Sequence, residues 1–134
     1  MANELNTTAI HALRRARVSD PDSGLSPERL SVLSVLVYAG PRTMGALATT
    51  EQVTRPAITR IVDALEDAGL VNREPDTADR RVVLVRATPA GRAVLEDARR
   101  RRVETLAAVL EGTSADELER LSQALAVVRR GLQT

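Results

Sequence analysis

The stretch 53-VTRPAITRIVDALEDAGLV-71 decides the fold, and its charges stand in an unusual order. Arg55 and Arg60 lie in its first half. All its acidic residues lie in its second half: Asp63, Glu66 and Asp67. A helix macrodipole favours acidic residues near the N-terminus and basic residues near the C-terminus, so this order opposes the preference of an isolated helix. A partner outside the helix is therefore expected to bind the basic end.

The same stretch has the pattern of an amphipathic helix. Thr54 is a typical N-cap, and Pro56 falls in the first turn, where a missing N–H costs little. Gly69 is expected to end the helix. Four apolar residues fall within one arc of a 3.6-residue helix: Ile58, Ile61, Val62 and Leu65. Thr59 and Arg60 point away from that arc, so they are expected to be exposed.

Three shorter helices are expected before this stretch. They are predicted over residues 4–17, from Ser26 to just before Gly40, and from Thr43 through Ala48. The segment SDPDSG, residues 19–24, breaks the first helix. The segment TTEQ, residues 49–52, is expected to be a turn that leads into the quoted stretch.

After the quoted stretch the period of the sequence changes. The segments LVNRE, residues 70–74, and RVVLVRA, residues 81–87, are rich in β-branched residues. They flank PDTADR, residues 75–80, which has the composition of a turn, so a two-stranded hairpin is predicted.

Two long helices are expected after the hairpin, one from Thr88-Pro89 to Glu111 and one that a capping box opens at Ser114. The last helix carries apolar residues at heptad-like spacing: Leu118, Leu121, Leu125, Val128 and Leu132. This seam is expected to be core, and its length favours a contact between two subunits.

Composition limits the function. The 134 residues fit one domain, and the absence of cysteine excludes disulfides and thiol chemistry. His11 is the single histidine and cannot form a zinc site unaided, so neither a metal nor a cofactor is expected. No catalytic constellation is present, which argues against an enzyme. No apolar segment is long enough to span a membrane, and a cytoplasmic protein is expected.

The net charge is only +1, but basic residues outnumber acidic ones between residues 54 and 102. This asymmetry is mild support for a polyanionic partner. The arginine run at residues 99–102 covers a full helical turn, so its members cannot all face one partner. A solvated helix face is expected there.

A short helix, a tight turn, a second helix and a hairpin form the order of a winged helix-turn-helix, a mainly α fold with a β-hairpin wing. In such modules the second helix enters the major groove of DNA. The candidate DNA contacts on that helix are Thr54, Arg55, Pro56, Ala57, Thr59 and Arg60. Arginine binds phosphates or guanine, threonine binds either, and proline or alanine contacts a thymine methyl group. An ordinary amphipathic surface helix remains the alternative.

The wing supplies two further candidates. Arg80 is expected in a narrow minor groove, where the potential is most negative. Arg81 is expected on a phosphate or paired with Asp79. A solvated charged turn is the alternative.

At these residues, from 25 to about 92, the chain resembles the MarR family of bacterial transcriptional regulators. The family's recognition helix typically reads Val-Ser/Thr-x-Pro-x-x-Thr-Arg, followed by an apolar residue and Val-Asp-x-Leu-Glu-x-x-Gly-Leu-Val, and residues 53–71 match it in order. The family's wing reads Asp-x-x-Asp-Arg-Arg, as residues 76–81 do. Its next helix often begins Leu-Thr-x-x-Gly, which residues 87–91 match with one substitution. Family members often carry an apolar residue and a glycine where this chain has Glu51 and Gln52.

The resemblance implies a single MarR-like domain over residues 1–134. Its winged helix-turn-helix core would span about 26–88, and a helical dimerisation region would combine about 4–17 with 89–132. The implied protein is a homodimeric repressor that binds a near-palindromic operator in double-stranded DNA and is released by a small lipophilic or phenolic effector. A winged-helix module that binds protein without DNA is the alternative.

The resemblance also assigns roles to single residues. Arg73 would pair with Asp63 and brace the wing, although an exposed strand residue is equally compatible with the sequence. His11 and Tyr38 are candidate effector contacts, with an ordinary structural role as the alternative for each.

Overall fold

The structure is a computed structural model that describes residues 1–133, so Thr134, the last residue of the expected domain, lies outside the described residues. The fold is mainly helical with one antiparallel hairpin, which confirms the predicted fold class. The elements in chain order are α1 (Ala2–Ala16), η1 (Arg17–Ser23), α2 (Pro27–Tyr38), α3 (Met44–Glu51), α4 (Arg55–Asp67), β1 (Val71–Pro75), β2 (Val83–Ala87), α5 (Pro89–Val109) and α6 (Ala115–Leu132).

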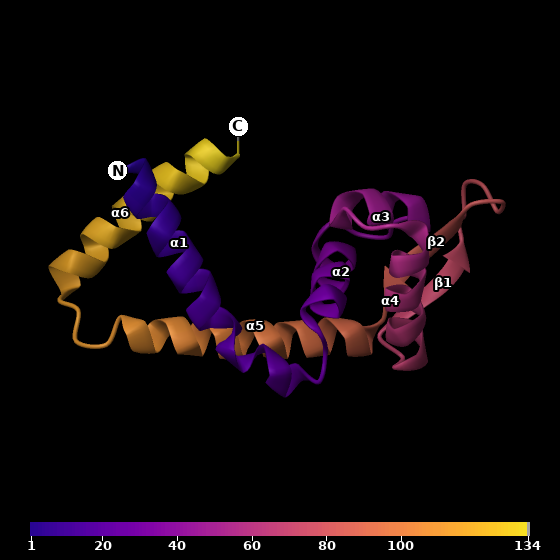
Figure 1. Ribbon diagram of the computed structural model, residues 1–134, viewed down its shortest axis with the longest axis horizontal. Helices are drawn as coiled ribbons and strands as arrows, with labels where there is room; N and C mark the ends of the chain where they lie inside the picture. The colour runs from indigo at the N-terminus through magenta and orange to yellow at the C-terminus, as the bar shows by residue number, and fades with distance from the viewer. Residues whose placement is uncertain (134) are drawn as a thin grey trace.

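The molecule is elongated, and α5 runs along most of its length (Figure 1). At one end of α5 lies the winged-helix body, which we define as residues 27–87 with helices α2, α3 and α4 and the hairpin. At the other end lie α1 and α6, the terminal helices. The 3-10 helix η1 connects α1 with α2 and packs against α5. The winged-helix body and the terminal helices are therefore joined by two segments, η1 and α5.

Most helices begin at the residue that the sequence predicts, because a hydroxyl caps them. In each case the side-chain oxygen accepts a hydrogen bond from the backbone N–H three residues later, at 3.1 to 3.3 Å. The five capping residues are Ser26, Thr43, Thr54, Thr88 and Ser114. A proline follows within the first turn of α2, α4 and α5, where its missing N–H breaks no helical bond. Local chemistry thus determines where the helices begin.

One prediction about a connecting segment is wrong. The segment 49–52 was expected to be a turn, but α3 continues to Glu51 and only Gln52 leaves the helix. Gln52 has a φ of +56°, a left-handed conformation that favours glycine, so this chain makes the turn between α3 and α4 without a glycine. The segment 19–24 breaks the first helix as expected, and most of it forms the 3-10 helix η1.

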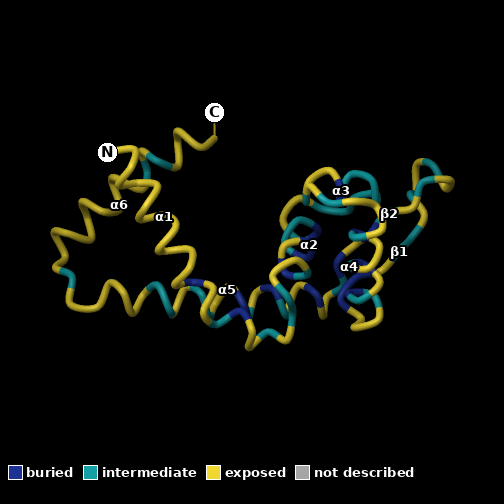
Figure 2. Tube along the Cα trace, viewed as in Figure 1, coloured by how far each residue is buried: buried dark blue, intermediate teal, exposed yellow. Residues whose placement is uncertain are grey.

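The core lies inside the winged-helix body and along the adjacent half of α5 (Figure 2). The largest fully buried side chains are Leu33, Leu36, Leu47, Ile58, Leu65, Val32, Val62, Val71 and Val85. The hairpin is tied to the start of α3 by two backbone hydrogen bonds between Arg42 and Val85, at 2.8 and 3.2 Å. The wing is therefore anchored at its base to the same core as the helix-turn-helix.

The beginning of α5 is hydrogen-bonded to the segment that follows α4, residues 69–70. Thr88 donates its backbone N–H to the carbonyl of Leu70 at 3.0 Å, and its hydroxyl donates to the carbonyl of Gly69 at 2.7 Å. Gly91 is buried beside them, and a Cβ on Gly91 would lie 2.2 Å from the Leu70 carbonyl oxygen. No side chain fits there, which explains the glycine.

The apolar seam of α6 is not covered by the protomer. Across Ala115–Leu132, all of which the structure describes, no residue is buried, and Leu121 and Leu125 expose 38% and 55% of their surfaces. The expectation that this seam is core is therefore wrong for the single chain. The reason is that neither α1 nor α5 lies over it closely enough to exclude water.

Candidate nucleic-acid interface

The first half of α4 presents the predicted side chains to solvent. Thr54, Arg55, Pro56, Thr59 and Arg60 are exposed, and Ala57 is half-buried. The opposite face of α4 packs into the core, as the apolar arc predicted. Within residues 1–133, no ion pair engages the guanidinium groups of the two arginines. They are therefore free to meet an external anion.

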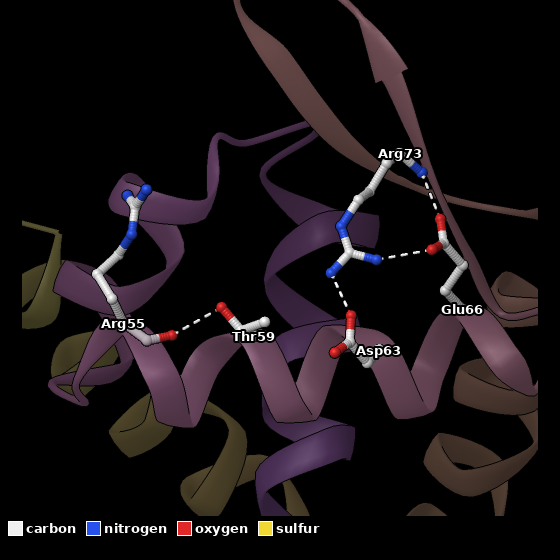
Figure 3. A network of polar contacts seen from close by, with 5 residues as sticks. All are labelled: Arg55, Thr59, Asp63, Glu66 and Arg73. Atoms are coloured by element: carbon white, nitrogen blue, oxygen red, sulfur yellow. Dashed lines mark hydrogen bonds and ion pairs between the residues drawn. The ribbon is translucent and has the colours of Figure 1, made fainter.

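The two threonines of this face are held by local hydrogen bonds. Thr54 accepts from the Ala57 N–H at 3.3 Å. Thr59 donates its hydroxyl to the Arg55 carbonyl at 2.8 Å (Figure 3). Each oxygen keeps a lone pair that can accept from a base edge. The Arg55 guanidinium lies beside the start of α3, since a Cβ on Gly45 would come within 2.8 Å of its Nη1.

A shallow hollow of about 260 Å³ extends this face toward α2. Arg60 and Ala57 line it from α4, and Arg29 and Glu28 line it from the first turn of α2. Arg29 was not predicted from the sequence, because only the packing of α2 across α4 brings it next to Arg60. An arginine in the first turn of α2, two helices before α4, is the signal that could have identified it.

The wing tip is ordered by aspartate side chains. Asp76 accepts from the Ala78 N–H at 3.2 Å, and Asp79 accepts from the Arg81 N–H at 3.1 Å. The Arg81 side chain also pairs with Asp79, its Nε lying 3.1 Å from Oδ1, and these bonds lower the pKa of the Asp79 carboxyl. The expected alternative of an Arg81–Asp79 pair is thus confirmed.

Arg80 differs from Arg81. It is exposed at the wing tip and takes part in no ion pair within residues 1–133. The tip therefore offers one arginine that is engaged and one that is available to an anion.

Two acidic residues in the second half of α4 bind an arginine of the wing. The Arg73 guanidinium on β1 donates to Asp63 at 2.5 Å and to Glu66 at 2.6 Å, and the Arg73 backbone N–H donates to the second Glu66 oxygen at 2.9 Å (Figure 3). The hydrogen bond with Asp63 is the main cause of the raised pKa of Arg73. The Arg73–Asp63 pair is confirmed, and Glu66 is an addition that the sequence analysis did not identify.

The arginines at residues 99–102 of α5 do not all have the same kind of partner. Arg99 and Arg100 are exposed and pair within the helix, with Glu96 and Asp97, as expected for a solvated face. Arg102 contradicts the expectation, because it reaches across to η1 and pairs with the buried Asp20. The reason is that η1 lies directly against this part of α5.

His11 and Tyr38 do not meet. His11 lines a hollow of about 680 Å³ between α1 and α5, whereas Tyr38 lines a separate hollow of about 430 Å³ between α2 and α5. The Tyr38 hydroxyl lies 3.4 Å from Glu96 Oε1 and donates to it. The two residues therefore cannot belong to one small site in the protomer.

Within residues 1–133 the structure has neither a metal site nor a membrane-spanning helix. That part of the chain contains no group of three or more acidic, histidine or cysteine side chains able to hold a metal ion. It also contains no helix with the length and apolar character needed to cross a membrane.

Helices α3 and α4, their tight turn and the hairpin define a winged helix-turn-helix. Comparison with known proteins gives the same class. The MarR family model matches residues 25–83. The HTH-type transcriptional regulator ML2140 of Mycobacterium leprae is 36% identical over 124 residues, which cover 92% of this chain and 87% of the relative. YdgJ of Bacillus subtilis, also an HTH-type transcriptional regulator, is 30% identical over 110 residues, 82% of this chain and 67% of the relative.

Solved structures agree on the fold. A MarR family protein from Bacillus stearothermophilus superposes with a TM-score of 0.82 at 26% identity, covering 99% of this chain and 93% of that one. The transcriptional regulator Tm0710 from Thermotoga maritima superposes with a TM-score of 0.85 at 24% identity, covering 99% and 96%, and at this identity it supports the fold alone.

The chain belongs to the MarR family of transcriptional regulators. It is therefore a DNA-binding regulator and not an enzyme, as the sequence predicted.

Proposed function

We propose that the chain is a homodimeric repressor of transcription that acts in the cytoplasm and binds a near-palindromic operator in double-stranded DNA. The observation that carries the proposal is the basic, exposed first half of α4, together with an exposed Arg80 on the wing that makes no ion pair within residues 1–133. Asp63 and Glu66 in the second half of α4 are paired with Arg73, so within the same residues they leave Arg55 and Arg60 without an acidic partner.

In this proposal the first turn of α4 enters the major groove. Arg55 and Arg60 bind phosphates or guanine, Thr54 and Thr59 bind base edges or phosphates, and Pro56 with Ala57 contacts a thymine methyl group. The wing places Arg80 in the minor groove next to the half-site. Arg81 is paired with Asp79 and contributes to DNA binding by stabilising the conformation of the wing tip. It reaches a phosphate only if that ion pair opens.

The proposal divides the single MarR-like domain, residues 1–134, into two working parts. The DNA-binding core spans about 26–88, and the dimerisation region combines about 4–17 with 89–132. Support for the dimer comes from α6, because four residues of its apolar seam are exposed in the protomer and the fifth, Val128, is only half-buried. An amphipathic helix with no buried residue requires a cover, and a second copy of the same helix is self-complementary.

The proposal includes a small lipophilic or phenolic effector that releases the repressor. The hollows lined by His11 and by Tyr38 are the candidate places for it, and they are separate. The first hollow has both apolar and polar lining residues, so a lipophilic ligand with a polar group would suit it. Its apolar lining is Ala12, Val18, Leu106 and Val109, and its polar lining is Thr7, Thr8, His11, Arg14 and Arg15.

The test is selection of bound duplexes from a random DNA library, followed by footprinting of the recovered sequence. We expect an inverted repeat whose half-sites are centred about 10 bp apart, because a two-fold dimer presents both recognition helices to one face of the duplex. Recovery of no shared sequence, together with binding that ignores salt, would favour a protein-interaction module. A single half-site without a repeat would refute the dimeric mode of binding.

A further inference from the structure

Asp20 and Arg102 form a two-point ion pair between two elements that are far apart in the sequence. Arg102 Nε lies 2.6 Å from Asp20 Oδ1, and Nη2 lies 2.7 Å from Oδ2. Asp20 is 5% exposed and is the one buried charged residue within residues 1–133. Paired, parallel hydrogen bonds between a guanidinium and a carboxylate fix orientation as well as distance.

The pair lies between the two segments that join the two ends of the molecule. Asp20 lies on η1, and Arg102 lies on α5, the two segments that join the winged-helix body to the terminal helices (Figure 1). The neighbouring arginines of the run pair with acidic residues of α5 itself. Within residues 1–133, Arg102 thus makes the one ion pair that connects the two segments.

The carboxylate is presented by a rigid segment. Ser23 donates its hydroxyl to the Asp20 carbonyl at 2.6 Å and accepts from the Leu25 N–H at 3.1 Å. Pro21 lies inside η1 and restricts its backbone, and Gly24 ends η1 in the left-handed conformation at a φ of +74°. Arg102 therefore binds an anchored group and not a mobile loop.

An ion pair with one buried partner is a poor source of stability, since apolar residues of similar size often serve as well, so we explain this pair by the geometry it specifies. Here that geometry is the angle at which the winged-helix body, together with the first half of α5, is set against the terminal helices, because the pair fixes η1 on α5. Arg102 lies about 20 Å along α5 from Pro89, given 1.5 Å per helical residue. A rotation of about 10° over that length moves the recognition helix by about 3.4 Å, which is one base-pair step.

We propose that Asp20 and Arg102 are positioning residues that set the separation of the two recognition helices, and so the half-site spacing that the dimer accepts. This inference depends on the proposed function, because it requires a dimer that binds two half-sites. Neither residue contacts DNA in this scheme. Their effect on DNA binding is exerted through the angle at the junction of η1 and α5.

The experiment uses the full chain and a series of duplexes. Each duplex carries the two selected half-sites with their separation changed in single base-pair steps, and one duplex carries a single half-site. The variants are Asp20→Asn and the double variant Asp20→Leu with Arg102→Met, in which apolar packing replaces the pair and protects the fold. The matched controls are Asp22→Asn at an exposed position of η1 and Arg99→Gln at an exposed position of α5.

We expect the native protein and both controls to show one sharp optimum of spacing. The double variant should lose about tenfold in affinity at that optimum and less than about threefold at spacings one base pair away, so its profile flattens. Its binding to the single half-site and its sedimentation as a dimer should not change.

An unchanged profile in the double variant would overturn the positioning role. An equal loss at every spacing, including the single half-site, would also overturn it, because it would show general damage to the fold. If the native protein itself shows no preferred spacing, then the proposed dimeric function fails first, and this inference fails with it.

Discussion

Arg73 binds both oxygens of Glu66, one through its backbone N–H at 2.9 Å and the other through its side chain at 2.6 Å. This contact joins the first strand of the wing to the recognition helix at two points. Together with Asp63 it explains why two of the three acidic residues of α4 stand in the half where the helix dipole does not favour them. Their partner is the wing, and the basic half remains free.

Removal of this brace should loosen the wing more than it destabilises the protein. For Arg73→Ala we expect the free energy of unfolding to fall by about 1 kcal/mol or less, because both carboxylates are more than a third exposed and solvent screens the pair. The affinity for specific DNA should fall by about tenfold, since Arg80 would no longer be held in place. Thermal melting and a binding titration measure the two effects.

The control for this change is Arg86→Ala, which removes an exposed arginine of β2 that pairs with Glu74 inside the hairpin. It should change neither quantity appreciably. Equal loss of DNA affinity in both variants would mean that the link to α4 is not what positions the wing.

Removal of Arg60 and removal of Arg80 should change DNA affinity in different ways. Arg60→Ala should cost about 1 to 3 kcal/mol and relax preference at particular bases if Arg60 binds guanine, whereas a phosphate contact would weaken all sequences alike. Arg80→Ala should lower affinity chiefly for sites with narrow, A/T-rich flanks. Titrations on specific and scrambled duplexes at several salt concentrations separate these outcomes, since each lost phosphate contact lowers the salt slope. Native-like binding by both variants would assign the basic face another purpose.

Charge in the α6 seam should abolish the dimer. For Leu121→Glu we expect sedimentation as a monomer at micromolar concentration and loss of operator binding, because a carboxylate would be buried in an apolar contact. Gln123→Glu places the same charge on the opposite face of α6 and should remain dimeric. A monomeric native protein with a melting temperature independent of concentration would contradict the premise.

Gly91 should not tolerate a side chain. The Cβ of Gly91→Ala would meet the Leu70 carbonyl oxygen at 2.2 Å and Leu33 Cδ1 at 3.1 Å, so we expect a loss of about 1 to 3 kcal/mol in unfolding free energy. In α6, the Cβ of Gly131→Ala would meet nothing within 4 Å, and that control should be neutral or stabilising. Chemical denaturation at fixed protein concentration gives both values.

At Gln52, in contrast to Gly91, we expect a substitution to stabilise the protein. Its φ of +56° disfavours any residue with a Cβ by about 1 to 2 kcal/mol, and glycine avoids that cost. Gln52→Gly should therefore raise the melting temperature slightly, with DNA binding unchanged. A lower melting temperature would show that the Gln52 side chain contributes more than the conformation costs.

Sequence alone determined the local features of this protein. Hydroxyl caps, first-turn prolines and the 3.6-residue period depend on a few neighbouring residues, so the starts of α2, α4, α5 and α6 and the buried arc of α4 could be predicted. The hairpin was predictable for the same reason, because β-branched residues flank a turn-forming segment. The candidate DNA contacts followed from the order of these elements.

Tertiary structure decided the contacts between residues distant in the chain. Asp20 and Arg102 are 82 positions apart, and no local pattern shows that η1 lies against α5. Arg29 approaches Arg60, and Glu66 joins the Arg73 pair, only because helices and strand pack in this arrangement. The α6 seam has a pattern that predicts burial, but whether the protomer covers it depends on how the terminal helices pack. Local propensity determines the elements, whereas their pairing depends on how all the apolar faces are buried at once.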